Sequence, residues 1–355
     1  MTAPPLDRAD LHARVQKALD SFLDEHRATL IGVSADLDVF LDVLRALVKG
    51  GKRLRPAFCY WGWRGAQGND EDTVVTAATS LELLHACAII HDDVMDASDT
   101  RRGQPSVHRR FASLHDEWHA RGSATGFGAA AAILLGDLCL AWADEMFTSS
   151  GLPAEALRRA RPAYNQMRTE LMAGQYLDVL EQARGGGSID NAMRVVRYKS
   201  AKYTIERPLH IGGQLAGAPP AVLDAYTAYG LPLGEAFQLR DDLLGVYGDP
   251  HETGKPAGDD LREGKRTVLV AMAYERADDG QRAALDEHLG DPDLDAESIA
   301  LLRAVIRSTG AVGEVERRIT ALTEQALAAL DDAPLDSDAA AVLRELAAAA
   351  TARRE

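Results

Sequence analysis

Apolar residues recur at intervals of three and four along almost every segment of the chain, which is the spacing of one face of an α-helix. Ala, Leu, Arg and Glu dominate these segments and β-branched alternation is scarce, so the pattern predicts an all-α fold. The predicted helices span about residues 8–30, 35–49, 54–66, 72–96, 123–149, 153–182, 188–216, 219–245, 265–278, 280–288, 296–309, 311–331 and 336–352.

The loops between these helices show no low-complexity linker, and no repeat period stands out. We therefore predict a single helical domain over residues 1–355, with a flexible tail at residues 1–8. The predicted helices at 72–96 and 123–147 are apolar on nearly all sides, and such helices belong inside a domain. Burying a carboxylate there is costly, so the acidic residues that these helices carry indicate a specific role.

The net charge of the chain bears on which classes of molecule it can bind. The chain has 54 acidic and 39 basic side chains and a formal net charge of -15, which disfavours non-specific binding of polyanions, and we expect no nucleic-acid partner. An anionic substrate must then be received by a local basic site or by metal ions.

The sequence also bears on cellular location. The three cysteines, Cys59, Cys87 and Cys139, lie in apolar stretches without metal-ligand spacing, which favours buried reduced thiols over disulfides. The N-terminal residues lack the apolar segment of a signal peptide. Charged residues interrupt the most apolar windows before about 20 apolar residues accumulate. We expect a cytoplasmic protein without a membrane span.

A pair of carboxylates ends the predicted helix at 72–96. Asp92 and Asp96 are one helical turn apart on the same face, and two like charges so close repel unless a cation lies between them. Mg²⁺ suits this position because it binds oxygen and uses one or two carboxylates together with substrate phosphates. Arg101 and Arg102 follow, and paired guanidinium groups suit phosphate oxygens. A solvated acidic helix end is the alternative for this motif taken alone.

A second acidic cluster ends the predicted helix at 219–245 in the same way. It consists of Gln238, Asp241 and Asp242, and the loop after it supplies Lys255, Lys265 and Arg266. Two matched acidic helix ends, each followed by basic residues, are hard to explain as chance surface charge.

The motifs together resemble the trans-isoprenyl diphosphate synthases, the family of farnesyl, geranylgeranyl and longer polyprenyl diphosphate synthases, over nearly the whole chain. Five motifs occur in the order of that family: GGKRLRP at 50–56, LLHACAIIHDDVMDASDTRRG at 83–103, GDL at 136–138 with MAGQYLD at 172–178, YKSAKYT at 198–204, and FQLRDDLLG with GKPAGDDLREGKRT at 237–267. The resemblance implies an all-α helical bundle around a central active-site cavity, and a homodimer built from the long central helices.

The resemblance also implies roles for the allylic diphosphate site. Asp92, Asp96 and Asp241 would hold three Mg²⁺ ions, with Mn²⁺ as an alternative ion, and Asp93 would support the site from the side. Gln238 and Asp242 would lie beside the last ion. The allylic diphosphate would be bound by four basic residues, Lys199, Lys255, Lys265 and Arg101.

Isopentenyl diphosphate would be held without metal by Lys52, Arg55, His85 and Arg102, with Arg53 as a nearby charge. Taken alone, GGKRLRP equally fits a helix-capping turn, and His85 fits a hydrogen-bonded core histidine. The stretch 245–264 is long and rich in Gly and charge, so we interpret it as a lid over the phosphates, with a surface excursion as the alternative.

One position departs from the family pattern. The second motif reads Asp241-Asp242-Leu-Leu-Gly245, where a third aspartate is the commonest residue in the family. We expect activity to survive this change, and Asp249 is a candidate substitute for the missing carboxylate.

The implied reaction is ionisation of an allylic diphosphate (dimethylallyl, geranyl or farnesyl), condensation with isopentenyl diphosphate, and loss of a proton. Ala88 and Cys87 stand where farnesyl-producing relatives carry bulky aromatic residues, so a pocket running along residues 88, 87, 84 and 81 favours geranylgeranyl diphosphate. Farnesyl and longer products remain alternatives. So do a class I terpene cyclase, whose second metal motif is missing here, and a catalytically silent partner subunit.

Overall fold

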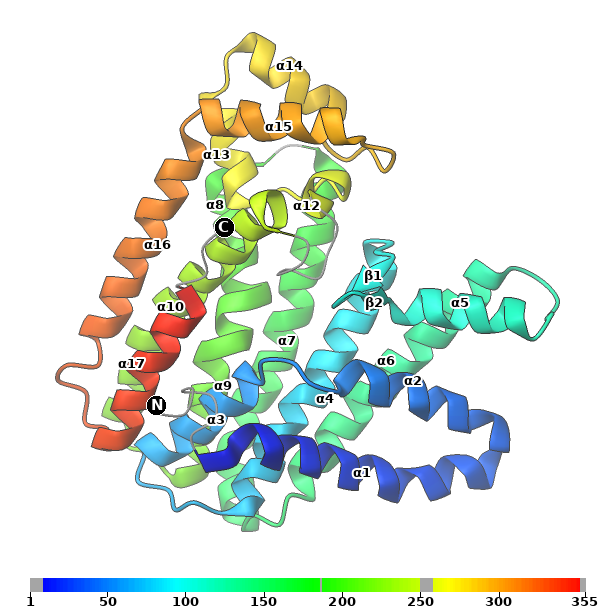
Figure 1. The fold of residues 1–355 in the computed structure, drawn as a ribbon. Helices are drawn as coiled ribbons and strands as arrows, with labels where there is room; N and C mark the ends of the chain where they lie inside the picture. Colours follow the sequence, from blue (N-terminus) through cyan, green and yellow to red (C-terminus); the bar gives the residue numbers. More distant parts are fainter. Residues whose placement is uncertain (1–8, 186, 250–257, 352–355) are drawn as a thin grey trace.

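The computed structural model describes residues 9–185, 187–249 and 258–351, and it is built almost entirely of helices (Figure 1). The tail at 1–8 and Lys255 lie outside these residues. The elements of the first half are α1 (Leu11–Val33), the 3-10 turn η2 (Ala35–Leu37), α2 (Asp38–Val48), α3 (Leu54–Gly65), α4 (Asp72–Met95), β1 (Thr100–Arg101), β2 (Gln104–Pro105), α5 (Val107–Glu117), α6 (Ala124–Thr148) and α7 (Ala154–Arg184). Those of the second half are α8 (Ile189–Val195), the π-helix η3 (Val196–Glu206), α9 (Arg207–Ala216), α10 (Pro220–Tyr247), α12 (Asp259–Arg262), α13 (Val268–Arg276), α14 (Asp279–His288), α15 (Ala296–Ser308), α16 (Ala311–Ala328) and α17 (Ser337–Thr351).

The all-α prediction is confirmed, and three local features differ from it. The helix α5 and the short antiparallel pair β1–β2 lie between residues 96 and 123, where we predicted no element. Charged and histidine residues surround the few apolar positions of α5, which weakens its helical pattern. The predicted helix at 188–216 is divided into α8, η3 and α9. A π-helix has one more residue per hydrogen-bonded turn, and apolar spacing alone does not reveal it.

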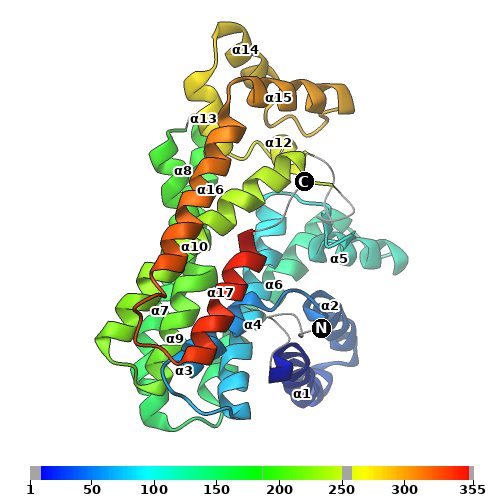
Figure 2. The same cartoon turned by 60° about the vertical axis from the view of Figure 1, so that its left-hand side comes forward.

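Two clusters of buried apolar side chains form the core. The larger is built mainly from α1 to α7, α9, α17 and the first half of α10, and the smaller from α8, the second half of α10 and α12 to α16. In both views α16 runs beside α10, while α13, α14 and α15 gather at the end of the molecule opposite α1 (Figures 1 and 2). The helix α10 passes through both clusters without a break.

The helix α6 does not lie inside the domain as we predicted. By length and composition, both α4 and α6 are apolar enough to cross a membrane, but 72% of the most apolar window of α4 is buried in the fold and only 33% of that of α6. The exposed side chains of α6 include Phe127, Ile133 and Leu134. One face of α6 packs on α4 and α5, and the opposite face is exposed.

The π-helix η3 is packed tightly between α7 and α10. A Cβ atom added at Gly174 of α7 would lie 2.5 Å from the backbone nitrogen of Lys199, and one added at Gly234 of α10 would lie 2.5 Å from the Cα of Ala201. These distances are shorter than any real Cβ contact, so only glycine allows the backbones to approach this closely. The two glycines thereby fix the position of Lys199.

We expect Gly174→Ala to push η3 away from α7 and to lower the free energy of unfolding by about 1–3 kcal/mol, the usual cost of overpacking. The matched control is Gly32→Ala, because Gly32 is exposed in α1 and an added Cβ meets nothing within 4 Å. That control should leave stability unchanged or raise it by up to about 1 kcal/mol. Denaturant unfolding measures both, and equal effects of the two substitutions would contradict the close-packing argument.

Candidate active site

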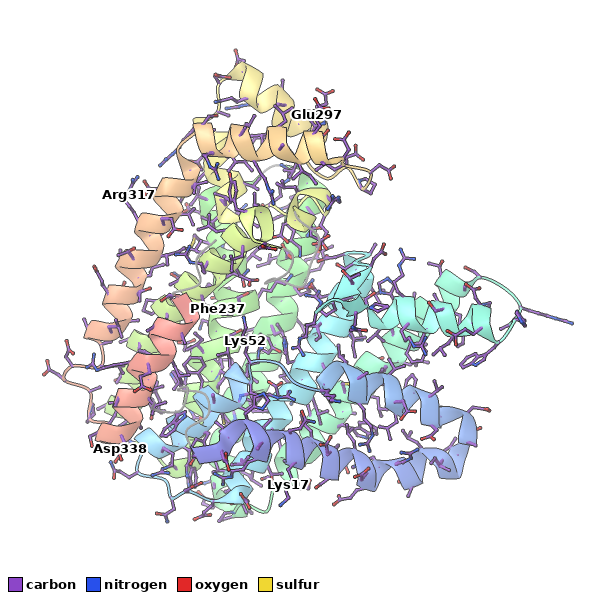
Figure 3. The ribbon with its side chains drawn as sticks, viewed as in Figure 1. Lys17, Lys52, Phe237, Glu297, Arg317 and Asp338 are labelled. Carbon is purple, nitrogen blue, oxygen red and sulfur yellow. The ribbon has the colours of Figure 1, made fainter. Side chains whose placement is uncertain are left out.

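A cavity of about 980 Å³ lies where α4, α7, η3 and α10 face one another. Of the site residues that the sequence predicts, those lining the cavity are Lys52, Arg55, His85, Asp92, Arg101, Arg102, Lys199, Gln238, Asp241 and Lys265. Asp96 reaches the same group of side chains through its contact with Lys265. In Figure 3, Lys52 and Phe237 lie near the centre of the molecule, whereas Lys17, Glu297, Arg317 and Asp338 lie at its edge.

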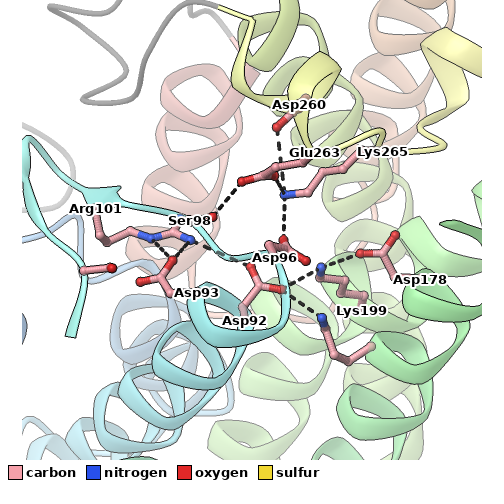
Figure 4. Close-up of polar contacts among 12 residues, drawn as sticks. Asp92, Asp93, Asp96, Ser98, Arg101, Asp178, Lys199, Asp260, Glu263 and Lys265 are labelled. Atoms are coloured by element: carbon pink, nitrogen blue, oxygen red, sulfur yellow. Dashed lines mark hydrogen bonds and ion pairs between the residues drawn. The ribbon is translucent and has the colours of Figure 1, made fainter. Parts of the chain in front are cut away.

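Asp92, at the end of α4, is neutralised by a lysine from another helix. The ammonium group of Lys199 lies 3.1 Å from Oδ1 of Asp92 and 2.7 Å from Oδ2 of Asp178 on α7 (Figure 4). The side-chain amide of Gln175 donates a 2.8 Å hydrogen bond to the same oxygen of Asp92. Burial would raise the pKa of Asp92, but the charges of Lys199, Lys265 and Arg101 hold it well below its usual range.

Asp96 has a different lysine as its counter-ion. Nζ of Lys265 lies 3.1 Å from Oδ2 of Asp96 and 2.7 Å from Oε2 of Glu263. Ser98 donates a 2.6 Å hydrogen bond to Oε1 of Glu263, which ties the end of α4 to the segment after α12 (Figure 4). Burial raises the pKa of Asp96 to about 6, and the neighbouring charge of Asp92 adds to the effect while Lys265 opposes it.

The second aspartate of the first motif has a supporting position. Asp93 is fully buried and accepts a 2.9 Å hydrogen bond from Nε of Arg101, which β1 brings back over the end of α4. The guanidinium of Arg101 also lies 3.8 Å from Asp92. Asp93 therefore fixes an arginine that borders the cavity, in agreement with the support that we predicted for it.

The second acidic motif ends α10 on the other side of the cavity. Asp241 is exposed toward the cavity, whereas Asp242 is only 5% exposed and accepts a 2.8 Å hydrogen bond from Nε2 of Gln238. Burial, with the charges of Asp260 and Asp241, raises the pKa of Asp242 to about 8. Oδ2 of Asp242 has no hydrogen-bond partner among the described residues.

This donor set fits divalent cations that are shared with a phosphate substrate. Within the described part of the chain, no three carboxylate, histidine or cysteine side chains converge to hold a metal alone. Mg²⁺ commonly uses one or two carboxylates and completes its shell with water and substrate phosphates. The carboxylates of Asp92 and Asp96 at the end of α4 and those of Asp241 and Asp242 at the end of α10 supply such ligands. Oδ2 of Asp242 is buried and makes no hydrogen bond to the described residues. The ammonium groups of Lys199 and Lys265 balance part of this negative charge.

A separate basic group lies at the start of α3. Nη2 of Arg55 donates a 2.9 Å hydrogen bond to Thr204, and its guanidinium stacks 4.1 Å from the ring centre of Tyr203. The hydroxyl of Tyr203 lies 3.3 Å from Nδ1 of His85. Burial and the nearby arginines hold the pKa of His85 well below its usual range, so this imidazole is neutral at pH 7. Arg102 borders the same group and donates to the carbonyl of Leu47 at 3.3 Å.

Arg53 differs from its neighbours in the GGKRLRP motif. It is 3% exposed, and its guanidinium pairs with Glu82 of α4 at 2.5 Å. A second contact of 2.5 Å joins it to the carbonyl of Val48. Arg53 therefore holds the start of α3 against α4, as the prediction of a nearby charge allows, and Lys52 and Arg55 line the cavity.

The structure adds residues to which we assigned no role from the sequence. Gln175 of α7 contacts Asp92 of the first motif, Asp178 of α7 contacts Lys199, and Glu263 and Asp260 lie beside Lys265. The signal for the first two was present in MAGQYLD, where two polar side chains are spaced on one helix face. Asp249, which we suggested as a substitute for the missing aspartate, is exposed, and the carboxylate beside Gly245 belongs to Asp260.

The apolar wall of the cavity is shorter than we predicted. Ala88 and Ile89 line it, and Leu171 closes part of the opposite side. The positions expected further along the pocket, Cys87, Leu84 and Leu81, are fully buried in the core and do not border the cavity. The helix α6 packs along α4, and the sequence of α4 alone did not show this.

The raised pKa of Asp242 predicts a pH dependence of stability in the metal-free protein. Between pH 4 and pH 8 the unfolded chain loses this proton first, so the folded state binds more protons and the free energy of unfolding falls as the pH rises. We expect the melting temperature to fall by at least about 2 °C more in the wild type than in Asp242→Asn over this range. Calorimetry with a chelator present tests this, and parallel curves for the two proteins would contradict it.

The chain is similar in sequence to several known proteins. Residues 38–306 match the family model described as Polyprenyl synthetase. A geranylfarnesyl diphosphate synthase of Aeropyrum pernix is 33% identical over 295 residues, which cover 82% of this chain and 86% of the relative. A geranylgeranyl diphosphate synthase of Mycobacterium tuberculosis is 30% identical over 334 residues, covering 93% and 89% of the two chains.

Solved structures agree with these relatives. The crystal structure of a geranylgeranyl pyrophosphate synthase from Corynebacterium glutamicum, complexed with isoprenyl diphosphate and magnesium, superposes with a TM-score of 0.95 at 44% identity and covers 100% of both chains. The match to the family model extends over most of the chain and includes both acidic motifs. The chain therefore belongs to the polyprenyl synthetase family and is a trans-prenyl diphosphate synthase.

Proposed function

We propose that this enzyme condenses isopentenyl diphosphate with allylic diphosphates to give geranylgeranyl diphosphate, with Mg²⁺ as its cofactor. One observation carries the proposal: a single cavity brings together two carboxylate groups with lysines and, beside them, a separate arginine and histidine group. The first group suits a metal-bound diphosphate, and the second suits a diphosphate held by side chains alone. Two different anions can therefore lie next to each other.

The allylic diphosphate would bind between α4 and α10. Asp92, Asp96 and Asp241 would hold up to three Mg²⁺ ions, which supply Lewis-acid stabilisation of the departing diphosphate when they are bound. Lys199 and Lys265 already lie beside these carboxylates, so their ammonium groups would donate hydrogen bonds to the same diphosphate. The charges are fixed before the reaction, which is the arrangement that stabilises a transition state most effectively.

Isopentenyl diphosphate would bind to Lys52, Arg55, His85 and Arg102, a group that contains no carboxylate for a metal. The neutral imidazole of His85 would accept or donate one hydrogen bond without adding charge. Its low pKa makes it a poor acceptor for the proton that condensation releases, so we assign that proton to the departing diphosphate. Ala88, Ile89 and Leu171 would exclude water from the allylic cation.

We further propose a cytoplasmic homodimer. The open face of α6 carries Phe127, Ile133 and Leu134, and α7 adds Met172 and Tyr176 as exposed apolar side chains. Exposed apolar side chains gathered on long helices are typical of a protein or membrane contact. A second copy of the chain fits it best, because α6 is packed on α4 and α5 along its other face and cannot leave the fold to enter a membrane.

The direct test is to incubate the purified protein with Mg²⁺, labelled isopentenyl diphosphate and each allylic primer in turn. We expect a twenty-carbon diphosphate as the main product. Shorter or longer diphosphates would reject the product assignment. A cyclic hydrocarbon from the primer alone, or no product at all, would support the cyclase or silent-subunit alternatives.

Asp92→Asn should lower turnover by about 100-fold, because it removes the negative charge that would bind the metal ion of the diphosphate complex while keeping the shape of the side chain. The matched control is Asp99→Asn, since Asp99 lies beyond the same helix end and its side chain is 70% exposed. Steady-state assays at saturating Mg²⁺ compare the two variants. Near-normal turnover of Asp92→Asn would reject the metal assignment.

Ala88→Phe should shorten the main product by at least one isoprene unit, because Ala88 borders the cavity and an aromatic ring there would close its apolar end. Leu84, one turn further along α4, is buried behind Ala88, so Leu84→Ala should extend the cavity into the core by about one turn of 5.4 Å and lengthen the product by about one isoprene unit. Chromatography of the dephosphorylated products measures both effects. A product distribution that is unchanged in both variants would show that α4 does not set the length of the product chain.

A further inference from the structure

A second cavity, of about 510 Å³, is lined by the end of α10, α12 and α15 (Figure 1). None of the described residues that line it also lines the catalytic cavity. Its volume falls in the range of pockets that hold small molecules, roughly 300–1,000 Å³. Its described lining consists of Tyr247, four apolar residues of α15 and three arginines, Arg262, Arg303 and Arg307, with no acidic residue among them. In a chain with a net charge of -15, this local excess of positive charge is unusual.

Neutral groups hold the arginines of α15 in place. Nε of Arg303 donates a 2.6 Å hydrogen bond to the carbonyl of Val246 at the end of α10. The guanidinium of Arg307 lies 5.1 Å from the ring centre of Tyr247, and the hydroxyl of Tyr247 donates a 2.9 Å hydrogen bond to the carbonyl of Arg303. These contacts position the two guanidinium groups, and none of them offsets the positive charge with a carboxylate.

Arg303 also carries a donor that the described part of the protein leaves unsatisfied. Its Nη2 is buried and makes no hydrogen bond to a described residue. Burial lowers the pKa of Arg303, and the charges of Arg307 and Arg262 lower it further, so the three guanidinium groups are close enough to repel one another. A buried donor without a partner requires an acceptor from outside the chain, such as water or an ion. A cavity lined by charges of one sign concentrates the opposite ion.

The second cavity adjoins the catalytic one through α12. Nε of Arg262 donates a 3.3 Å hydrogen bond to the carbonyl of Leu294, which ties α12 to the segment before α15. The next residue, Glu263, accepts the hydrogen bond from Ser98 and pairs with Lys265. A ligand held by Arg262 would therefore lie beside the segment that carries a lysine of the catalytic cavity.

We propose that this cavity binds a small molecule with a diphosphate group, at a site separate from the catalytic cavity. The planar guanidinium group of arginine matches the oxygens of a phosphate and can bind two of them at once. A diphosphate carries several negative charges and offers oxygens to more than one arginine. The inference goes beyond the proposed function, because no residue of the second cavity takes part in the proposed condensation.

The test is isothermal titration calorimetry with inorganic diphosphate, in the presence of a chelator so that metal-dependent binding between α4 and α10 is absent. We expect Arg307→Gln to weaken binding at the second cavity by about 10-fold or more, because it removes a charge-assisted hydrogen-bond donor. Arg303→Lys should also weaken it, since it keeps the charge and loses the planar group. Thermal unfolding verifies that each variant is folded, and the exposed position of Arg307 makes its substitution the milder one.

Two further variants serve as comparisons. Arg317→Gln removes the same charge from α16, where the side chain is 71% exposed, and should leave diphosphate binding unchanged. Arg102→Gln should remove metal-free binding of diphosphate in the catalytic cavity and leave the second site intact. If Arg102→Gln changes nothing while Arg307→Gln removes binding, the proposed site for isopentenyl diphosphate fails and this inference stands. Wild-type affinity in both Arg307→Gln and Arg303→Lys would overturn the inference, as would a wild type that binds no diphosphate outside the catalytic cavity.

The source of the diphosphate group is identified by repeating the titrations with adenosine diphosphate and with farnesyl diphosphate. Each ligand is compared between the wild type and Arg307→Gln, so that only binding at the second cavity is counted. Tighter binding of adenosine diphosphate than of inorganic diphosphate would identify a nucleotide site, and tighter binding of farnesyl diphosphate a site for a prenylated ligand on the apolar residues of α15. Equal binding of all three would show that the diphosphate group alone is recognised.

Discussion

Mutual repulsion among the carboxylates at the facing ends of α4 and α10 is the constraint on which this structure depends. Asp92, Asp96 and Asp242 are buried or nearly so, and a low-dielectric interior makes unpaired charges there very costly. For Asp92 and Asp96 the fold meets this cost with lysines from η3 and from the segment before α13, whereas burial raises the pKa of Asp242 and favours its neutral form. Each lysine bridges elements that are distant in sequence, so the same contacts that neutralise the carboxylates also hold the cavity walls together.

This arrangement explains why two similar anions can be treated differently in one cavity. Near Asp92 the lysines are already paired with carboxylates, so an incoming diphosphate gains most when it brings divalent cations with it. The contacts of Arg55 are with the neutral side chains of Thr204 and Tyr203, so its charge can act on an anion in the cavity. In the proposed reaction, this difference in the partners of the basic residues would prepare one diphosphate to leave and retain the other.

Much of this could be predicted from the sequence, because helical periodicity and the two acidic helix ends are local patterns. Asp92 and Asp96 on one face, and Gln238 beside Asp242, follow from residue spacing alone. Other features depend on packing between distant segments. The carboxylate beside Gly245 belongs to Asp260 on α12 instead of nearby Asp249, and the positions expected to extend the apolar pocket beyond Ala88 are buried in the core and do not line the cavity. The exposed face of α6 could likewise not be predicted, since an apolar helix has the same sequence pattern whether it packs in its own core or lies at the surface.

Because η3 is a π-helix, the number of residues in this segment determines how Lys199 is oriented. A π-helix arises when one residue more than an α-helix needs is fitted between two fixed ends, and here α8 and α9 are both anchored by core contacts. Loss of one residue ahead of Lys199 would let the segment relax into an α-helix and turn that lysine by about 100° around the axis. Insertions and deletions in this stretch would therefore reprogram the active site without altering any of its chemical groups, a route to new specificity that residue-by-residue comparison of relatives would overlook.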